Sequence, residues 1–215
     1  MCERVEATKA QVFILESPSI ADEVYNRRDG KILYDFLKLK GLKPLYCNIG
    51  NSSDIEEAIE CFYNSGYRYL HLCCHGNDDS ICLGKTSFAY EELDFFEGMM
   101  HHRRLFISAC LLGNINFAKR LFNNNEEMYS ILAPTDEIAF STSLTFFSSL
   151  YHLLNECNSR SIKRDSFQFT IERLCETFGQ EFSYYSRGSE VKEKKFSNKN
   201  WHNQLLSLNP KNSSM

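Results

Sequence analysis

Residues 67–76 have the sequence YRYLHLCCHG, in which a run of aromatic and aliphatic residues ends abruptly at His75 and Gly76. A second apolar run, RLFISA at residues 104–109, ends in the same way at Cys110. Short apolar runs of this composition are typical of buried strands. We therefore expect two strands of one sheet, each followed directly by a reactive side chain.

Patterns of strand and helix alternate along the rest of the chain. Further strands are predicted at residues 11–17, 43–49 and 128–133, and a hairpin at residues 80–88. Helical spacing of apolar residues predicts helices over about 21–39, 55–64, 90–99, 115–122, 137–157 and 166–178. This alternation favours a three-layer α/β fold, a mostly parallel sheet with helices on both faces.

The character of the sequence changes after Gly179, because Lys, Asn and Ser dominate residues 192–215. Such a composition supplies few side chains for a packed core. We expect one folded domain over residues 1–180 and a peripheral or partly disordered C-terminal tail over residues 181–215.

The composition of the chain indicates which class of partner it binds and in which cellular compartment it works. The net charge of −4 is spread along the chain without a Lys/Arg stripe, so we expect a protein or peptide partner and no nucleic acid or membrane. The first residues lack a secretory signal and no apolar run is long enough to span a bilayer, which predicts a soluble cytoplasmic protein. Nine cysteines, several inside apolar runs, indicate free thiols in a reducing compartment. No structural metal or cofactor is expected.

His75 and Cys110 suggest the chemistry. In open α/β sheets, ligands bind at the carboxyl ends of the strands, and consecutive strands are usually neighbours. The two side chains are therefore expected to meet in one crevice, where an imidazole assists deprotonation of a thiol and later protonates a leaving amine. The N–H groups of Gly76 and Cys110 are candidates for an oxyanion hole.

The spans LHLCCHGNDDSICL (70–83), FISACLLG (106–113) and ILAPTDEIAFSTSLTFFSSLYHLL (131–154) resemble the caspase-like, or clan CD, cysteine peptidases. They are most similar to the bacterial CHAT-type branch of that clan. The resemblance covers about residues 67–154. It implies a caspase-like fold and a cysteine endopeptidase that acts on a protein substrate through an acyl-enzyme intermediate, without metal or nucleotide.

The same resemblance implies the roles of individual residues. His75 would be the general base and acid, Cys110 the nucleophile, and the amides of Gly76 and Cys110 the oxyanion hole. Ser108 would line the primary specificity pocket, where Asp136 or Glu137 on the following loop could add acidic character. Members of this clan commonly await activation, so we expect a separate activating protein or an upstream event.

Two alternatives to the peptidase remain open, and other histidines and acids have simpler explanations. The fold could be a catalytically silent protein-interaction module, or a flavodoxin-like domain, although no phosphate-binding glycine motif follows the first predicted strand. Asp78 and Asp79 could orient His75, but an exposed acidic loop is the favoured interpretation. For His101 and His102, an interaction with a helix C-terminus is favoured over metal binding.

Overall fold

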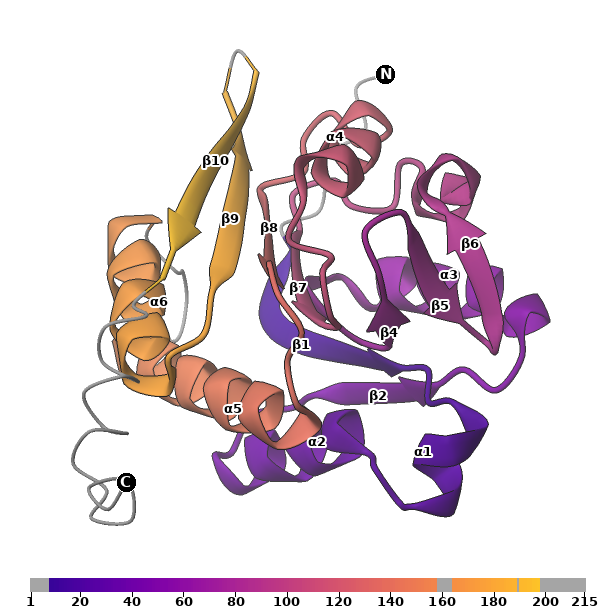
Figure 1. Ribbon diagram of the computed structural model, residues 1–215, viewed down its shortest axis with the longest axis horizontal. Coiled ribbons are helices and arrows are strands. Elements are labelled where there is room, and N and C mark those ends of the chain that lie inside the picture. Colours follow the sequence, from indigo (N-terminus) through magenta and orange to yellow (C-terminus); the bar gives the residue numbers. More distant parts are fainter. Residues whose placement is uncertain (1–7, 158–163, 189, 198–215) are drawn as a thin grey trace, which may run out of the picture.

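A seven-stranded sheet forms the centre of the computed structural model, which describes residues 8–157, 164–188 and 190–197 (Figure 1). The strand order is β10-β9-β8-β7-β3-β1-β2. Strands β2, β1, β3, β7 and β8 are parallel, whereas β9 and β10 are antiparallel additions at one edge. Their bounds are β1 Lys9–Glu16, β2 Leu45–Asn48, β3 Tyr67–Cys73, β7 Arg104–Ser108, β8 Ser130–Pro134, β9 Phe182–Arg187 and β10 Val191–Phe196.

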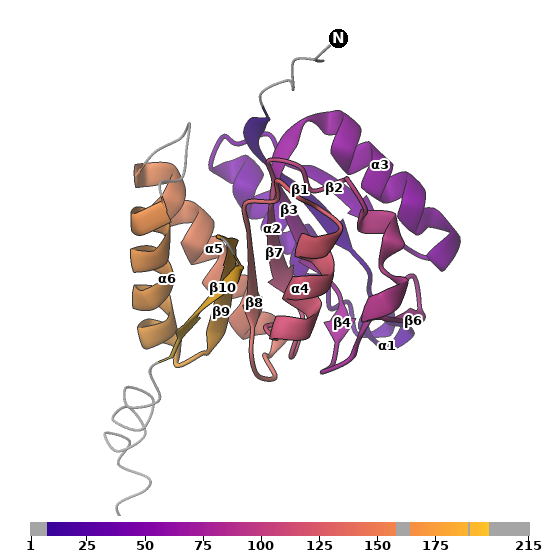
Figure 2. The same ribbon diagram turned by 90° about the horizontal axis from the view of Figure 1, so that it is seen from above.

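Helices cover both faces of this sheet, so the fold has three layers (Figure 2). On one face lie α2 (Asp29–Leu39), α5 (Phe140–Cys157) and α6 (Arg164–Phe178), and on the other lie α3 (Ile55–Ser65) and α4 (Ile115–Asn123). The short α1 (Ile20–Val24) follows β1 directly. A small antiparallel sheet, β4 (His75–Gly76), β5 (Ser80–Leu83) and β6 (Thr86–Ala89), follows β3.

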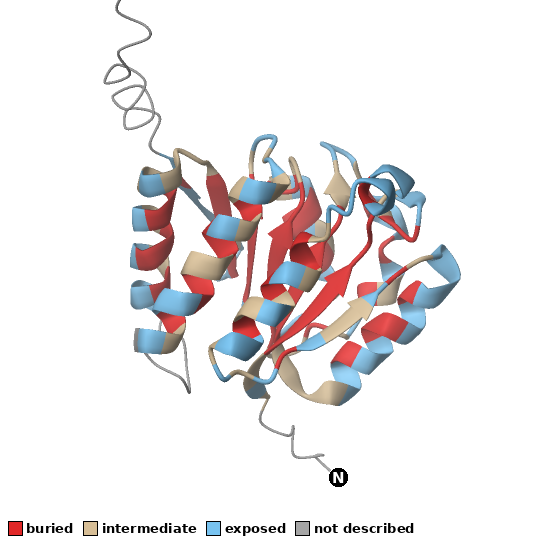
Figure 3. Cartoon of the chain, turned by 90° about the horizontal axis from the view of Figure 1, so that it is seen from below, coloured by how far each residue is buried: buried red, intermediate tan, exposed pale blue. Residues whose placement is uncertain are grey.

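Alternation along the strands builds two hydrophobic clusters, one on each side of the sheet. Phe13 and Leu15 of β1 join the cluster beneath α3 and α4, whereas Val12 and Ile14 join the cluster beneath α2, α5 and α6. This follows from the two-residue period of a strand. Figure 3 shows the result, a buried sheet between helices whose outer faces are exposed. Burial on both faces explains why the central strands are rich in apolar residues.

The three-layer α/β fold is confirmed, as are most of the predicted elements. The hairpin of β5 and β6 turns through Gly84 and Lys85, which both have positive φ values, 56° and 66°. That backbone matches the twist of a two-residue hairpin. Two helix predictions were wrong: the segment 21–39 is divided into α1 and α2, and residues 90–99 form two short 3₁₀ turns, Tyr90–Glu92 and Asp94–Phe96.

The C-terminal segment also differs from the prediction, because residues 182–187 and 191–196, assigned to a peripheral tail, form β9 and β10 of the main sheet. Tyr184 and Tyr185 are fully buried. The edge strand on this side of the sheet is β10, whose sequence VKEKKF is mostly exposed. Charged residues are a common way to protect an edge strand from pairing with another chain. Residues 198–215 of the predicted tail lie outside the described residues.

In the part of the chain that the structure describes, no helix has the length and apolar character needed to cross a membrane.

Candidate active site

His75 and Cys110 lie at the same level above two neighbouring strands. Cys73 of β3 is paired in register with Ser108 of β7, and each reactive residue follows its paired strand residue by two positions. Adjacent strands are about 4.8 Å apart. The carboxyl edge of the sheet therefore brings the two segments together, as expected for parallel strands.

A small cavity of about 30 Å³ joins the two side chains. His75 and Cys110 line it together with residues of the two strand ends and of the start of α5, namely Cys74, Ser108, Ala109, Ile138, Phe140 and Ser143. The His75 ring packs edge-on against the ring of Phe140, with centroids 5.7 Å apart. A cavity of this size holds water but is far smaller than a typical ligand pocket of about 300 Å³ or more.

Asp22 of α1 holds the imidazole. The Nε2 atom of His75 lies 2.6 Å from Asp22 Oδ2, and the Asp22 side chain is only 3% exposed whereas that of His75 is 42% exposed. A carboxylate can only accept a hydrogen bond, so Nε2 donates in this contact. The Nδ1 atom is then the ring nitrogen left to take a proton from a thiol.

Ser19 fixes Asp22 in turn. The N–H and Oγ–H of Ser19 donate to Asp22 Oδ2 at 2.9 and 2.6 Å, and Ser19 Oγ accepts from the Asp22 N–H at 3.2 Å, which makes a capping box at the start of α1. Burial opposes ionisation of Asp22, but the hydrogen bonds from Ser19 and His75 outweigh it and lower the pKa of this carboxyl below its ordinary value. Asp22 is thus an ionised, nearly inaccessible acceptor for the imidazole.

Sequence analysis missed Asp22, and the partner considered for His75 was different. Asp78 and Asp79 are exposed, and the Asp79 N–H donates to the side chain of Asn77, as expected for a solvated loop. A signal for Asp22 was present in the sequence. Ser19 and Asp22 have the spacing of a capping box and follow the first strand, whose carboxyl end lies at the candidate site.

The Cys110 thiol lies in a turn with constrained backbone. Its Sγ atom accepts a hydrogen bond from the N–H of Ile138 at 3.4 Å. The next residue, Leu111, has φ 62°, a left-handed conformation that non-glycine residues rarely adopt and that recurs at functional sites. Gly113 then turns the chain beside β8, where an added Cβ would lie 2.6 Å from the carbonyl oxygen of Pro134.

Gly76 packs directly against the segment that carries Cys110. An added Cβ would lie 2.7 Å from Leu112 Cγ and 3.0 Å from the carbonyl oxygen of Cys110. A residue with a side chain would therefore separate the two segments. This close approach of the backbones fits the expectation that Gly76 and Cys110 face one site, and the assignment of their N–H groups to an oxyanion hole stays a prediction.

Ser108 and Asp136, expected in substrate binding, lie in different surroundings. Ser108 is buried below Cys110, where its Oγ donates to Asp29 Oδ2 at 2.7 Å and also contacts Ser143 Oγ. Asp136 is exposed and does not line the cavity around Cys110; its backbone oxygen accepts from the Leu111 N–H at 3.4 Å. The acidic side chain bonded to Ser108 is therefore Asp29 of α2, which sequence analysis did not single out.

The buried Asp29 carboxyl gives a testable dependence of stability on pH. Burial raises its pKa from 3.8 to about 6, and repulsion from Glu16 adds to this rise, although the Ser108 hydrogen bond opposes it. A group that holds its proton more tightly when folded stabilises the fold at low pH, and this stabilisation is lost as the pH rises through about 6. This pKa difference corresponds to a change of at most ~3 kcal/mol in the free energy of unfolding.

We therefore expect Asp29→Asn, which keeps an acceptor for Ser108, to be more stable than the unmodified protein at pH above about 6. Below the ordinary pKa of aspartate the two proteins should be about equally stable. Urea unfolding of both proteins across this pH range measures the difference. An equal effect of the substitution at all pH values would contradict the argument.

The layers, strand order and site position define a caspase-like α/β fold. Among solved structures, the chain is similar to a secreted C11 cysteine protease, iotapain, from Bacteroides thetaiotaomicron, with a TM-score of 0.57, 9% sequence identity, and coverage of 83% of this chain and 66% of that chain. It is also similar to the complex of the Porphyromonas gingivalis RgpB pro- and mature domains, with a TM-score of 0.52, 15% identity, and coverage of 79% and 43%. No family model and no curated protein matches the sequence.

These structural similarities support the fold, and at 9% and 15% sequence identity they leave the activity to be argued from the residues. The chain spans 66% of the length of the first of these structures and 43% of the second.

Proposed function

We propose that this chain is a cysteine endopeptidase in which Cys110 is the nucleophile and His75 the general base and acid. The observation that carries the proposal is the position of the two side chains on one cavity, at the same level of neighbouring parallel strands. The hydrogen bond between His75 and the buried Asp22 supports it, because an oriented imidazole is what this chemistry requires.

In this mechanism His75 Nδ1 takes the proton from Cys110 Sγ, and the thiolate attacks the carbonyl carbon of a peptide bond. The N–H groups of Gly76 and Cys110 donate to the developing oxyanion. The C–N bond then breaks as the imidazolium protonates the leaving amine, which leaves an acyl group on Cys110. Water activated by His75 hydrolyses the thioester and releases the acid. The Asp22 carboxylate stabilises the imidazolium while it is charged.

Activation by a partner protein or an upstream event is part of the proposal. The cavity at Cys110 is bounded by Ile138 and Phe140, and its volume of about 30 Å³ cannot accept a peptide side chain. A substrate therefore requires movement of the segment that carries Ile138 and of the start of α5 at Phe140. The same closed geometry also fits the second candidate function, a catalytically silent protein-interaction module.

The finer assignments are proposals of the same kind. The spans quoted above favour the CHAT-type branch. Strands β9 and β10 belong with the domain predicted over residues 1–180 because they extend its sheet. Ser108, bonded to Asp29, is proposed to lie at the base of the specificity pocket, with Asp136 at its rim. The substrate is proposed to be a protein in the cytoplasm, and no nucleic acid or membrane is invoked.

Alkylation by a small electrophile separates the two functions without requiring substrate access. Iodoacetamide should modify the half-buried Cys110 faster than the exposed Cys61, by roughly tenfold, because an imidazole assists its deprotonation. The rates at individual cysteines are measured by mass spectrometry of digested protein. Cys61 serves as the internal reference for an unassisted thiol.

The matched variant is His75→Ala, which should slow alkylation of Cys110 and leave Cys61 unchanged. Equal rates at the two thiols, or a Cys110 rate that does not depend on His75, would favour the interaction module. The unmodified protein is then treated by limited proteolysis to release the segment around Ile138 that bounds the cavity. Its cleavage of a peptide library defines the cleavage-site preference.

A further inference from the structure

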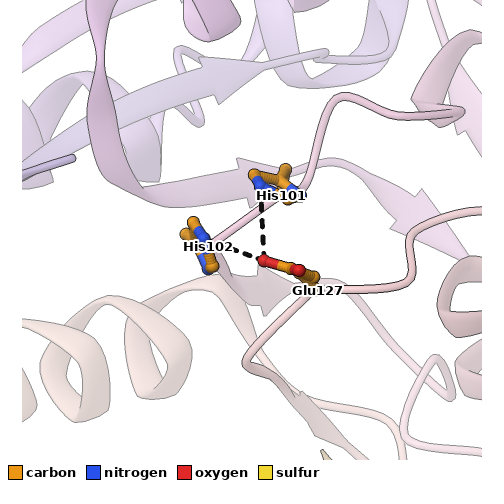
Figure 4. Close-up of side chains that lie close together, drawn as sticks. All are labelled: His101, His102 and Glu127. Atoms are coloured by element: carbon orange, nitrogen blue, oxygen red, sulfur yellow. Dashed lines mark ion pairs between the residues drawn. The ribbon is translucent and has the colours of Figure 1, made fainter. Parts of the chain in front are cut away.

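His101, His102 and Glu127 form a cluster of two histidines and one glutamate (Figure 4). His101 and His102 immediately precede β7, whereas Cys110 follows its carboxyl end. Glu127 comes from the connection between α4 and β8. The two segments are already joined by backbone hydrogen bonds, from His102 N to Glu127 O at 3.0 Å and from Tyr129 N to Arg103 O at 2.8 Å.

The side chains of this cluster converge on one point. The Nε2 atoms of His101 and His102 lie 3.3 and 2.8 Å from the same atom, Glu127 Oε2. One nitrogen or oxygen atom from each of the three residues lies within 4.8 Å of the others. Figure 4 shows both rings directed at the carboxylate. Three ligand atoms at this spacing are close enough to share one cation.

The backbone at His102 makes this convergence possible. Adjacent side chains in an extended chain point in opposite directions. His102 instead has φ 54°, which turns the chain so that the rings of His101 and His102 lie side by side, with centroids 4.1 Å apart. Left-handed backbone at a non-glycine residue is uncommon and recurs where a site requires it. The helix C-terminus favoured for these histidines from sequence is not present, since residues 90–99 form 3₁₀ turns.

The two imidazole rings, with centroids 4.1 Å apart, share a single carboxylate oxygen, so three potential ligand atoms face one point. Neutral imidazoles are the form that binds metal ions. With both rings neutral, their two nitrogens and the Glu127 oxygen provide three ligands with one negative charge, which matches a divalent cation.

We propose that His101, His102 and Glu127 bind one Zn²⁺ ion, with water completing a tetrahedral coordination. Imidazole nitrogen and carboxylate oxygen are the ligands that zinc prefers, whereas Ca²⁺ and Mg²⁺ prefer oxygen ligands throughout. The ion ties the segment before β7 to the connection before β8. It therefore stabilises the amino edge of the sheet and takes no part in chemistry at Cys110.

The affinity is set by the surroundings of His102. Its Nδ1 atom is buried and has no hydrogen-bond partner within the described residues. Partners of this second ring nitrogen are typically worth 10- to 100-fold in metal affinity. The rings and the carboxylate are also partly exposed to solvent. Binding should consequently be weaker than at a structural site with four protein ligands.

Zinc titration of the full chain tests the proposal, with the Cys110→Ser protein used throughout to remove the thiol at the candidate active site. We expect saturable binding of one ion by calorimetry and a rise in the unfolding temperature with zinc. Glu127→Gln, at an exposed position where folding should be unaffected, is expected to weaken binding by at least about tenfold, as is His101→Gln. His152→Gln, which removes an exposed histidine of α5, is the matched control and should bind zinc normally.

Cobalt distinguishes this site from binding by cysteines. Co²⁺ bound by imidazole and carboxylate lacks the intense thiolate charge-transfer absorption that cysteine ligands produce. Unchanged zinc affinity in Glu127→Gln and His101→Gln, or a thiolate band that accounts for the bound cobalt, would overturn the proposal. Because neither measurement uses peptidase activity, its failure would be distinguishable from failure of the proposed function.

Discussion

Replacing Cys110 by alanine should reduce peptide turnover at least ~10³-fold, to the background of the assay, and leave the fold intact. No other group can form the acyl intermediate if Cys110 is the nucleophile. The structural cost is small because the half-buried thiol makes only weak hydrogen bonds with the backbone of Ile138, accepting from its N–H at 3.4 Å and donating to its oxygen at 3.7 Å. We therefore expect a loss of about 1 kcal/mol or less in the free energy of unfolding. Turnover of a cleaved library peptide and urea unfolding measure the two effects.

The matched control is Cys47→Ala. Cys47 is also a half-buried free thiol, but it lies on β2, at the edge of the sheet, and does not line the cavity shared by His75 and Cys110. Its variant should retain turnover. Turnover retained in Cys110→Ala, or lost equally in both variants, would contradict the assignment of the nucleophile.

The parts of the fold that could be predicted are those encoded by residues adjacent in the sequence. Most residues of strands β3 and β7 are buried, so each strand is rich in apolar and aromatic residues and its end is visible in the sequence. Their parallel pairing then places His75 and Cys110 at one edge, which general rules for α/β sheets anticipate. The hairpin turn at Gly84 and Lys85 is local in the same sense.

The parts that sequence reasoning missed depend on tertiary contacts. The hydrogen bond between Asp22 and His75 joins residues 53 positions apart. The capping-box spacing of Ser19 and Asp22 marks the start of a helix, but it does not specify His75 as the partner of Asp22. Strand β10 is mostly charged, and it becomes a strand because it pairs along its whole length with β9, whose residues are largely buried. In residues 90–99, apolar residues at helical spacing are buried, but the chain packs as 3₁₀ turns beside α3 and α4.

The contact between Asp22 and His75 gives the second large effect expected for this protein. Asp22→Asn should lower the turnover number by roughly 10²- to 10⁴-fold with little change in the Michaelis constant. The asparagine is neutral and cannot stabilise the imidazolium that forms during the reaction. Its NH₂ group can also donate to His75 Nε2, which would place the ring proton on Nδ1, the atom that must accept a proton from the thiol.

If Asp22 had only a structural role, Asp22→Asn would lower stability without a specific loss of turnover. Asp22 also closes the capping box of α1 with Ser19, so the substitution is expected to cost about 1 kcal/mol of stability. Stability is therefore measured by urea unfolding alongside turnover. Asp79→Asn is the matched control, because Asp79 is an exposed acid close to His75 in sequence, and its variant should keep full turnover.

The decisive comparison is a double-mutant cycle with His75→Ala. If Asp22 acts by positioning the imidazole, Asp22→Asn should have almost no further effect on residual turnover, or on alkylation of Cys110, once His75 is absent. If Asp22 only supports α1, Asp22→Asn should reduce turnover by the same factor in the unmodified protein and in His75→Ala. An equal reduction of turnover by Asp22→Asn with and without His75 would exclude Asp22 from the mechanism. If the reduction disappears once His75 is absent, Asp22 is the residue that links α1 to the reacting groups at the carboxyl edge of the sheet.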